Sequence, residues 1–135
     1  MLVRHRKAAE LLLRRLADSG PYAVEFVGIQ TCVARHLGAA AAFLGRPDEA
    51  RAYYTQAMDL ATKLRFRPEM ALTRLQLAEL LLAHYPDEKA EAFEHLDFAI
   101  GELREMKMQP ALECALKQRE TLKAETAHDR RDRSP

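Results

Sequence analysis

Apolar residues recur every three or four positions along most of this chain, a spacing that places them on one face of an α-helix. Strict alternation of apolar and polar residues, the pattern of a half-buried strand, is not the dominant signal. The clearest stripes contain Leu72, Leu75, Ala78 and Leu82 in one segment and Phe93, Leu96, Ile100 and Leu103 in a later one. The pattern predicts an all-α protein.

Proline and glycine divide the chain into segments of helical length. We expect six helices, at about residues 2–18, 23–44, 47–65, 68–84, 86–107 and 110–127, with Gly28 as a candidate break in the second. Pro47, Pro68 and Pro86 are each followed by an acidic residue, as suits the first turn of a helix. The connections are short, so we expect neighbouring helices to be antiparallel.

The composition supports this fold class. Val and Ile total only six residues and Trp is absent, which excludes a β-sandwich or β-barrel because strands need such side chains. With 21 basic and 20 acidic residues the net charge is +1, so the chain lacks the basic excess of a nucleic-acid-binding protein. Hydrophobic residues make up 48% of the chain, enough for the core of one domain.

The ends of the chain differ from its middle. We expect an N-terminal amphipathic helix and linker over residues 1–22, a helical domain over 23–127 and a disordered polar tail over 128–135. The first 16 residues hold five Lys and Arg on a Leu-rich pattern, which resembles a transit peptide or a membrane-surface helix. We favour an ordinary packed helix whose apolar face is Leu12, Leu13 and Leu16.

We expect a cytoplasmic protein without a membrane span. No apolar stretch approaches the ~20 residues that cross a bilayer. The N-terminal segment lacks the cleavage-like region of a secretory signal. Cys32 and Cys114 both fall within predicted helices, and two such distant cysteines are read as reduced thiols rather than as a disulfide framework.

The chain contains an internal repeat. Residues 57–68 and 99–110, which lie 42 positions apart, share Ala, large apolar residues and a final Pro at matching positions. Upstream, the tripeptide Pro-Asp-Glu at 47–49 returns at 86–88. A period of about this length is typical of stacked helical hairpins. We therefore expect a hairpin unit of 40 to 42 residues, present about twice, with flanking helices at both ends.

The repeated residues resemble the tetratricopeptide repeat (TPR). Small and large apolar residues stand at its characteristic offsets: Leu37, Gly38, Ala41, Ala50, Tyr54 and Ala57 in one copy, and Leu77, Ala78, Leu81, Ala92, Leu96 and Ala99 in the next, where the last three are shifted by two positions. Small residues such as Gly38 let helix backbones approach closely, while Tyr54 and Leu96 fill the space between turns. The period is longer than the family's, and Ala34 and Thr62 replace its usual Trp and Pro.

The stretch from Leu37 to Ala50 is also similar to the C-terminal repeat region of bacterial adenylate-cyclase-like ATPases and transcriptional regulators. The resemblance covers about residues 24–116 and implies a short right-handed superhelix of helix hairpins. It carries no nucleotide-binding, cyclase or DNA-binding motif with it.

Catalytic chemistry has little support in the sequence. The five glycines are dispersed, so no phosphate-binding loop is present, and no His-Glu-x-x-His motif occurs. We therefore expect a protein that is not an enzyme and has no metal or cofactor. Glu91 and His95 are one turn apart and could ligate a metal, but a solvated acid–base pair is the preferred interpretation. Cys32 lies near Arg35 and is interpreted as a small core residue rather than as an activated thiol.

The TPR resemblance implies that a peptide or helix binds on the concave face formed by the first helix of each pair. It assigns to that face Arg35, Ala39, Leu72, Leu75, Glu79, Lys117 and Thr121. Charge reversal at Arg35 or Glu79 is then expected to weaken binding without unfolding the protein.

Three alternatives stay open at this point. In the first, the last helix fills the groove and the leucines assigned to the concave face belong to the core. In the second, exposed apolar helix faces pair two copies into a homodimeric regulatory fragment of a bacterial signalling or transcriptional regulator. In the third, the chain is a helical enzyme or metal protein of unknown type.

Overall fold

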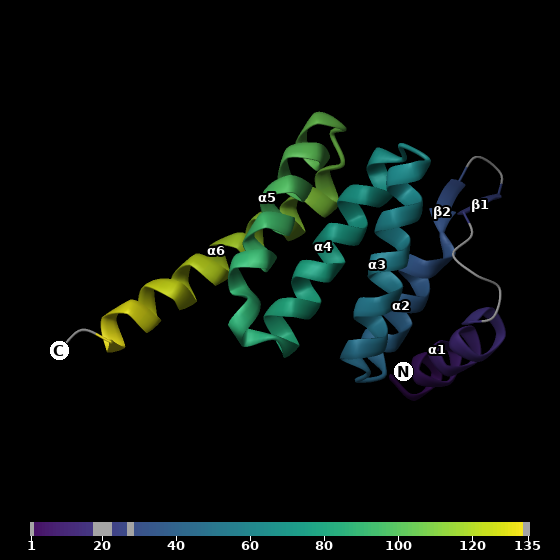
Figure 1. The fold of residues 1–135 in the computed structure, drawn as a ribbon, viewed down its shortest axis with the longest axis horizontal. Coiled ribbons are helices and arrows are strands. Elements are labelled where there is room, and N and C mark those ends of the chain that lie inside the picture. Colours follow the sequence, from purple (N-terminus) through teal and green to yellow (C-terminus); the bar gives the residue numbers. More distant parts are fainter. Residues whose placement is uncertain (1, 18–22, 27–28, 134–135) are drawn as a thin grey trace.

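The computed structural model describes residues 2–17, 23–26 and 29–133 (Figure 1). Their elements are α1 Leu2–Leu16, β1 Ala23–Phe26, β2 Ile29–Cys32, α2 Val33–Phe43, α3 Pro47–Lys63, α4 Arg67–His84, the short 3-10 helix η2 Pro86–Glu88, α5 Lys89–Glu105 and α6 Gln109–Asp132. The described part of the chain thus has six α-helices, which confirms the all-α class and the expected number of helices.

A short β-hairpin replaces nearly half of the second predicted helix. Strands β1 and β2 pair antiparallel, with Ala23 opposite Cys32 and Phe26 opposite Ile29. The prediction of one helix from residue 23 to 44 is therefore wrong at its start, and Gly28 lies outside the described residues. The physical reason is local propensity: residues 24–31 contain the densest run of β-branched and aromatic residues in the chain, which favour strands.

Two other helix boundaries differ from the prediction: the helix expected from residue 86 begins at Lys89, after the 3-10 helix η2, and the last helix ends later than expected. Helix α6 continues to Asp132, five residues beyond the predicted end at residue 127. Residues 123–132 contain Lys, Ala, Glu and Arg but neither Gly nor Pro, so nothing in them ends a helix. The predicted start of a disordered tail at residue 128 is wrong as far as residue 132, whereas residues 134 and 135 lie outside the described part.

The helices form two antiparallel hairpins, α2–α3 and α4–α5, which pack side by side through α3 and α4 (Figure 1). Helix α1 packs against α2 at one end of this row, and α6 packs against α5 and α4 at the other. The C-terminal half of α6 extends past the other helices, at the end of the molecule opposite α1. The predicted hairpin organisation is therefore present.

Three helices end in the same way, and two of these ends mark the repeat. Gly45, Arg65 and Lys107 have positive φ angles of 74°, 52° and 55°. In each case the next residue's N–H reaches back to a carbonyl five residues earlier, as in Phe66 to Ala61 at 2.9 Å and Met108 to Leu103 at 3.0 Å. This is the Schellman arrangement of a helix C-terminus. Arg65 and Lys107 are 42 positions apart, so the repeat seen in the sequence is also a repeat of backbone geometry.

The core consists of leucines between the hairpins and of small residues where helices cross. The largest fully buried side chains include Leu37, Leu81, Leu96, Leu103 and Leu122. Gly38 is a point of close approach: a Cβ atom added there would lie 2.6 Å from Cε1 of Tyr54, which is itself buried. The close approach expected at Gly38 is therefore present, and Tyr54 is the side chain that lies against it.

His95 on α5 is buried rather than solvated, with 8% of its surface exposed. Its Nε2 lies 3.4 Å from Oε1 of Glu91, and its Nδ1 is buried without a hydrogen-bond partner among the described residues. The interpretation of Glu91 and His95 as a solvated pair is thus wrong for the histidine. The four-residue spacing correctly predicted that Glu91 and His95 are in contact. The burial of His95 could not be predicted in this way, because it depends on the packing of α5 against its neighbours.

This burial predicts a specific loss of stability in mild acid. Burial lowers the pKa of His95 below its ordinary value of 6.5, against the opposing effect of Glu91. The folded state therefore binds this proton more weakly than the unfolded chain does. The stability contributed by neutral His95 is complete above pH 6.5 and is lost as the pH falls through the lowered pKa. Urea denaturation between pH 7.5 and 5.5 should show this loss in the wild type.

The control for that experiment is another histidine. His95→Gln should have a flatter dependence of the free energy of unfolding on pH over this range. His84→Gln, which changes an exposed side chain in the last turn of α4, should keep the wild-type slope. Equal slopes for the wild type and His95→Gln would contradict the prediction.

Candidate partner-binding groove

Arg35, the first residue assigned to the concave face, is part of a buried ion pair. It lies on α2, and its guanidinium donates to both carboxylate oxygens of Glu69 on α4, at 2.7 Å from Nε and 3.0 Å from Nη2. The two side chains are only 12% and 3% exposed. A bidentate pair of this kind fixes the position of α2 relative to α4. Arg35 therefore has a structural role that the sequence pattern did not indicate.

The other predicted residues fall in three places. Leu75 is 5% exposed and belongs to the core, and Leu72 is half-buried against it, as the filled-groove alternative expected. Ala39 lines a separate shallow hollow between α1 and α2, together with Leu12 and Phe43. The structure brings three of the predicted residues together at one groove, namely Glu79, Lys117 and Thr121.

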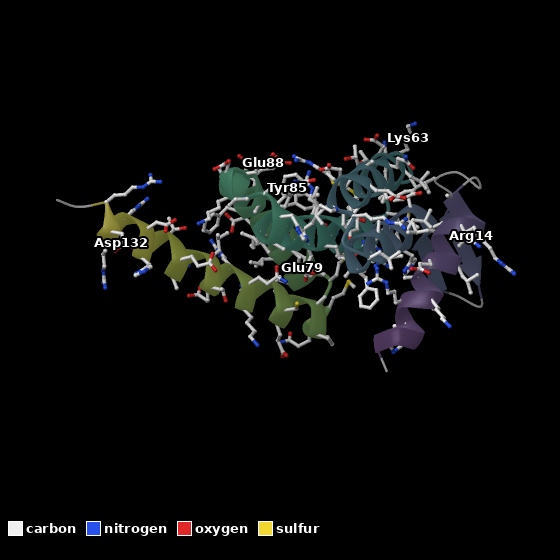
Figure 2. The ribbon with its side chains drawn as sticks, turned by 90° about the horizontal axis from the view of Figure 1, so that it is seen from below. Arg14, Lys63, Glu79, Tyr85, Glu88 and Asp132 are labelled. Atoms are coloured by element: carbon white, nitrogen blue, oxygen red, sulfur yellow. The ribbon has the colours of Figure 1, made fainter. Side chains whose placement is uncertain are left out.

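This groove runs between the C-terminal half of α4 and the middle of α6 and has a volume of about 430 Å³. Figure 2 shows Glu79 beside α6, on the side of the molecule away from Lys63. Apolar groups form its floor and polar groups its rim. We name it the α4–α6 groove; its lining residues are Glu79, Leu82, Ala83, Cys114, Lys117, Gln118, Thr121, Leu122 and Glu125.

Hydrogen bonds across the groove hold its two walls together. Gln118 Nε2 on α6 donates to Glu79 Oε1 on α4 at 2.6 Å. Cys114 Sγ lies 3.8 Å from the same oxygen. Partial burial, followed by the nearby charge of Glu79, raises the pKa of the Cys114 thiol above its ordinary value. The thiol is therefore protonated at neutral pH and is a poor nucleophile.

The charge of Glu79 also reaches the core side of the groove. Burial, with Glu79 as the second cause, raises the pKa of Tyr54 to about 12. The phenol therefore stays neutral at physiological pH.

Sequence reasoning missed Cys114, Gln118, Leu122 and Glu125 as lining residues. A signal was available, since positions 114, 118, 121 and 125 follow one another at three- and four-residue intervals on one helix face. The repeat selected only Lys117 and Thr121 on this helix, because α6 has no following helix with which to define a third hairpin. The core interpretation of Cys32 is confirmed, since it is 2% exposed and packs with Ala34 and Ala57.

Comparisons with known proteins do not extend this picture. No family model, no curated protein and no solved structure matches the chain. Within the described residues no helix is both long enough and apolar enough to cross a membrane. In the same part of the chain no group of three or more His, Cys, Asp or Glu side chains is placed to hold a metal ion. The function must therefore be argued from the α4–α6 groove itself.

Proposed function

We propose that this chain is a non-catalytic protein-interaction module, of TPR-like organisation and cytoplasmic location, that binds a helix or an extended peptide in the α4–α6 groove. The observation that carries the proposal is the groove between α4, the first helix of the second hairpin, and α6, the helix that follows that hairpin. Its volume of about 430 Å³ is that of a site for a few side chains.

The lining of the groove suits a peptide better than a small polar metabolite. Leu82 and Ala83 offer apolar surface to anchoring side chains, and burial of such surface is the main source of affinity in helix-in-groove recognition. Charged and amide groups at the rim, such as Lys117 and Gln118, would orient the bound chain.

The proposal can be tested by filling the groove. Ala83 is exposed in the last turn of α4 and lines the groove, so Ala83→Trp should occupy the space needed by an anchoring side chain. Peptides are selected from a displayed random library against the wild-type chain, and their dissociation constants are measured by fluorescence polarisation. We expect Ala83→Trp to weaken these peptides about tenfold or more, which corresponds to losing one buried anchor.

Ala52→Trp is the matched control, because Ala52 is an exposed alanine on α3 and does not line the groove. It should leave the dissociation constants unchanged. Thermal unfolding followed by circular dichroism checks that both variants are folded. Selected peptides that bind Ala83→Trp as tightly as the wild type would show that the groove is not the binding site.

A further inference from the structure

Three exposed side chains form a line along α6 on the groove side. Lys117, Thr121 and Glu125 are spaced by four residues, so they follow one another on the same helix face. Thr121 donates its hydroxyl hydrogen to the carbonyl of Lys117 at 3.1 Å. In the part of the chain that the structure describes, the charged groups of Lys117 and Glu125 form no ion pair. The line therefore presents a free positive charge and a free negative charge at equal distances from Thr121.

The charges along this line are complementary to those of a second copy of α6 that runs in the opposite direction. If a second α6 lies antiparallel to the first, with Thr121 facing Thr121, then Lys117 of each copy faces Glu125 of the other. The two-fold symmetry of such a contact makes both ion pairs form together, as in any isologous interface. A parallel arrangement in the same register would place like charges opposite each other and would be disfavoured.

The C-terminal half of α6 also lacks packing of its own. Among the described residues Leu122 is the last buried one, and from residue 123 to 133 every side chain except the half-buried Thr126 is exposed. One ion pair, from Lys89 to Asp129 at 3.2 Å, connects this part of the helix to α5. A helical stretch of this length is marginal in water without packing. An antiparallel neighbour would lie along it from residue 117 onward.

We propose that the helix bound in the α4–α6 groove is α6 of a second copy of this chain, which makes a two-fold symmetric dimer with Lys117–Glu125 ion pairs. The inference rests on the proposed function, because it names the occupant of the groove defined there. The apolar floor at Leu82 and Ala83 is covered by the second helix. The paired charges set the antiparallel register.

A charge exchange tests the register. Sedimentation velocity over a range of concentrations gives the dimer dissociation constant of the wild type, Lys117→Glu, Glu125→Lys and the double variant. Each single variant places two pairs of like charges in the interface and should raise the dissociation constant about tenfold or more. The double variant restores both ion pairs with the two charges exchanged. Its dimer dissociation constant should return to near the wild-type value. Lys63→Glu, which reverses an exposed charge on α3, should have no effect.

A disulfide tests the symmetry independently. Thr121→Cys in a Cys114→Ser background should form a covalent dimer under mild oxidation, because the two Thr121 positions face each other across the two-fold axis. Lys63→Cys in the same background should stay monomeric on denaturing gels. Circular dichroism establishes that the variants are folded.

The outcomes separate this inference from the proposed function. A wild-type chain that is monomeric at every concentration, or folded single variants that dimerise like the wild type, would overturn the dimer. If selected peptides still lose affinity for Ala83→Trp in that case, the groove binds a foreign partner and the proposed function stands. If the chain dimerises, rescue by the double variant supports the antiparallel register and failure of rescue overturns it.

Discussion

Arg35→Glu is expected to lower the free energy of unfolding by about 3–5 kcal/mol, the usual cost of breaking a buried ion pair by changing one partner. The variant would place a second carboxylate against Glu69, whose side chain is only 3% exposed. Equilibrium denaturation with urea at pH 7, followed by circular dichroism, measures the change. The expectation from sequence, that this reversal weakens binding without unfolding the protein, is thereby replaced by a prediction of lost stability.

The double variant Arg35→Met/Glu69→Leu distinguishes a broken pair from a general intolerance to substitution. Replacing both charges with apolar side chains of similar size removes the desolvation cost along with the attraction, so such changes are often close to neutral. We expect the double variant to be far more stable than Arg35→Glu. If the midpoint of urea denaturation is the same for Arg35→Glu and the wild type, the ion pair does not hold α2 against α4.

Tyr54→Ala is expected to lower the free energy of unfolding by a similar amount, about 3–5 kcal/mol, because it removes a large buried side chain and leaves a cavity. Tyr54 is 3% exposed and lies against Gly38 on the facing helix. Gly38→Ala should itself cost about 1–3 kcal/mol, since the added methyl group would stand 2.6 Å from the tyrosine ring. Alanine's better helix propensity, about 1 kcal/mol, offsets only part of this.

The two substitutions should be strongly coupled. In a chain that already carries Tyr54→Ala, the methyl group of Gly38→Ala enters the cavity instead of meeting the ring. The second substitution should then be neutral or stabilising, and the double-mutant cycle should give a coupling energy above about 1 kcal/mol. The prediction would be contradicted if Gly38→Ala raised the free energy of unfolding while Tyr54 is present. That result would show that α2 and α3 can move apart without loss of stability.

The sequence anticipated a close approach of helix backbones at Gly38 and a space-filling role for Tyr54, because a repeat places small and large residues at fixed offsets. It did not pair the two residues, and the structure brings them together. The sequence also did not anticipate the Arg35–Glu69 pair, because 34 positions separate the two residues and no local pattern connects them. The sequence indicated only that Glu69 is an acidic residue in the first turn of its helix, where it complements the helix dipole.

Only part of the candidate site was predicted, because the repeat selects positions on a helix face without showing what packs against them. Glu79, Lys117 and Thr121 were selected by the repeat and do line one groove. Leu75 was selected by the same rule and is buried in the core. Helical periodicity identifies a face but not what lies against it, so it could not separate a groove floor from a core position.

The sequence by itself determined the fold class, the helix boundaries from Pro47 to His84 and the repeat of 42 residues. These depend on local physics: the spacing of apolar side chains, the missing amide of proline and the helix ends near Arg65 and Lys107. Only the tertiary structure decided that Arg35 is paired, that His95 is buried and that α4 and α6 enclose a groove. Each of these depends on the distance between helices far apart in sequence, which is set by the packing of the whole row of helices.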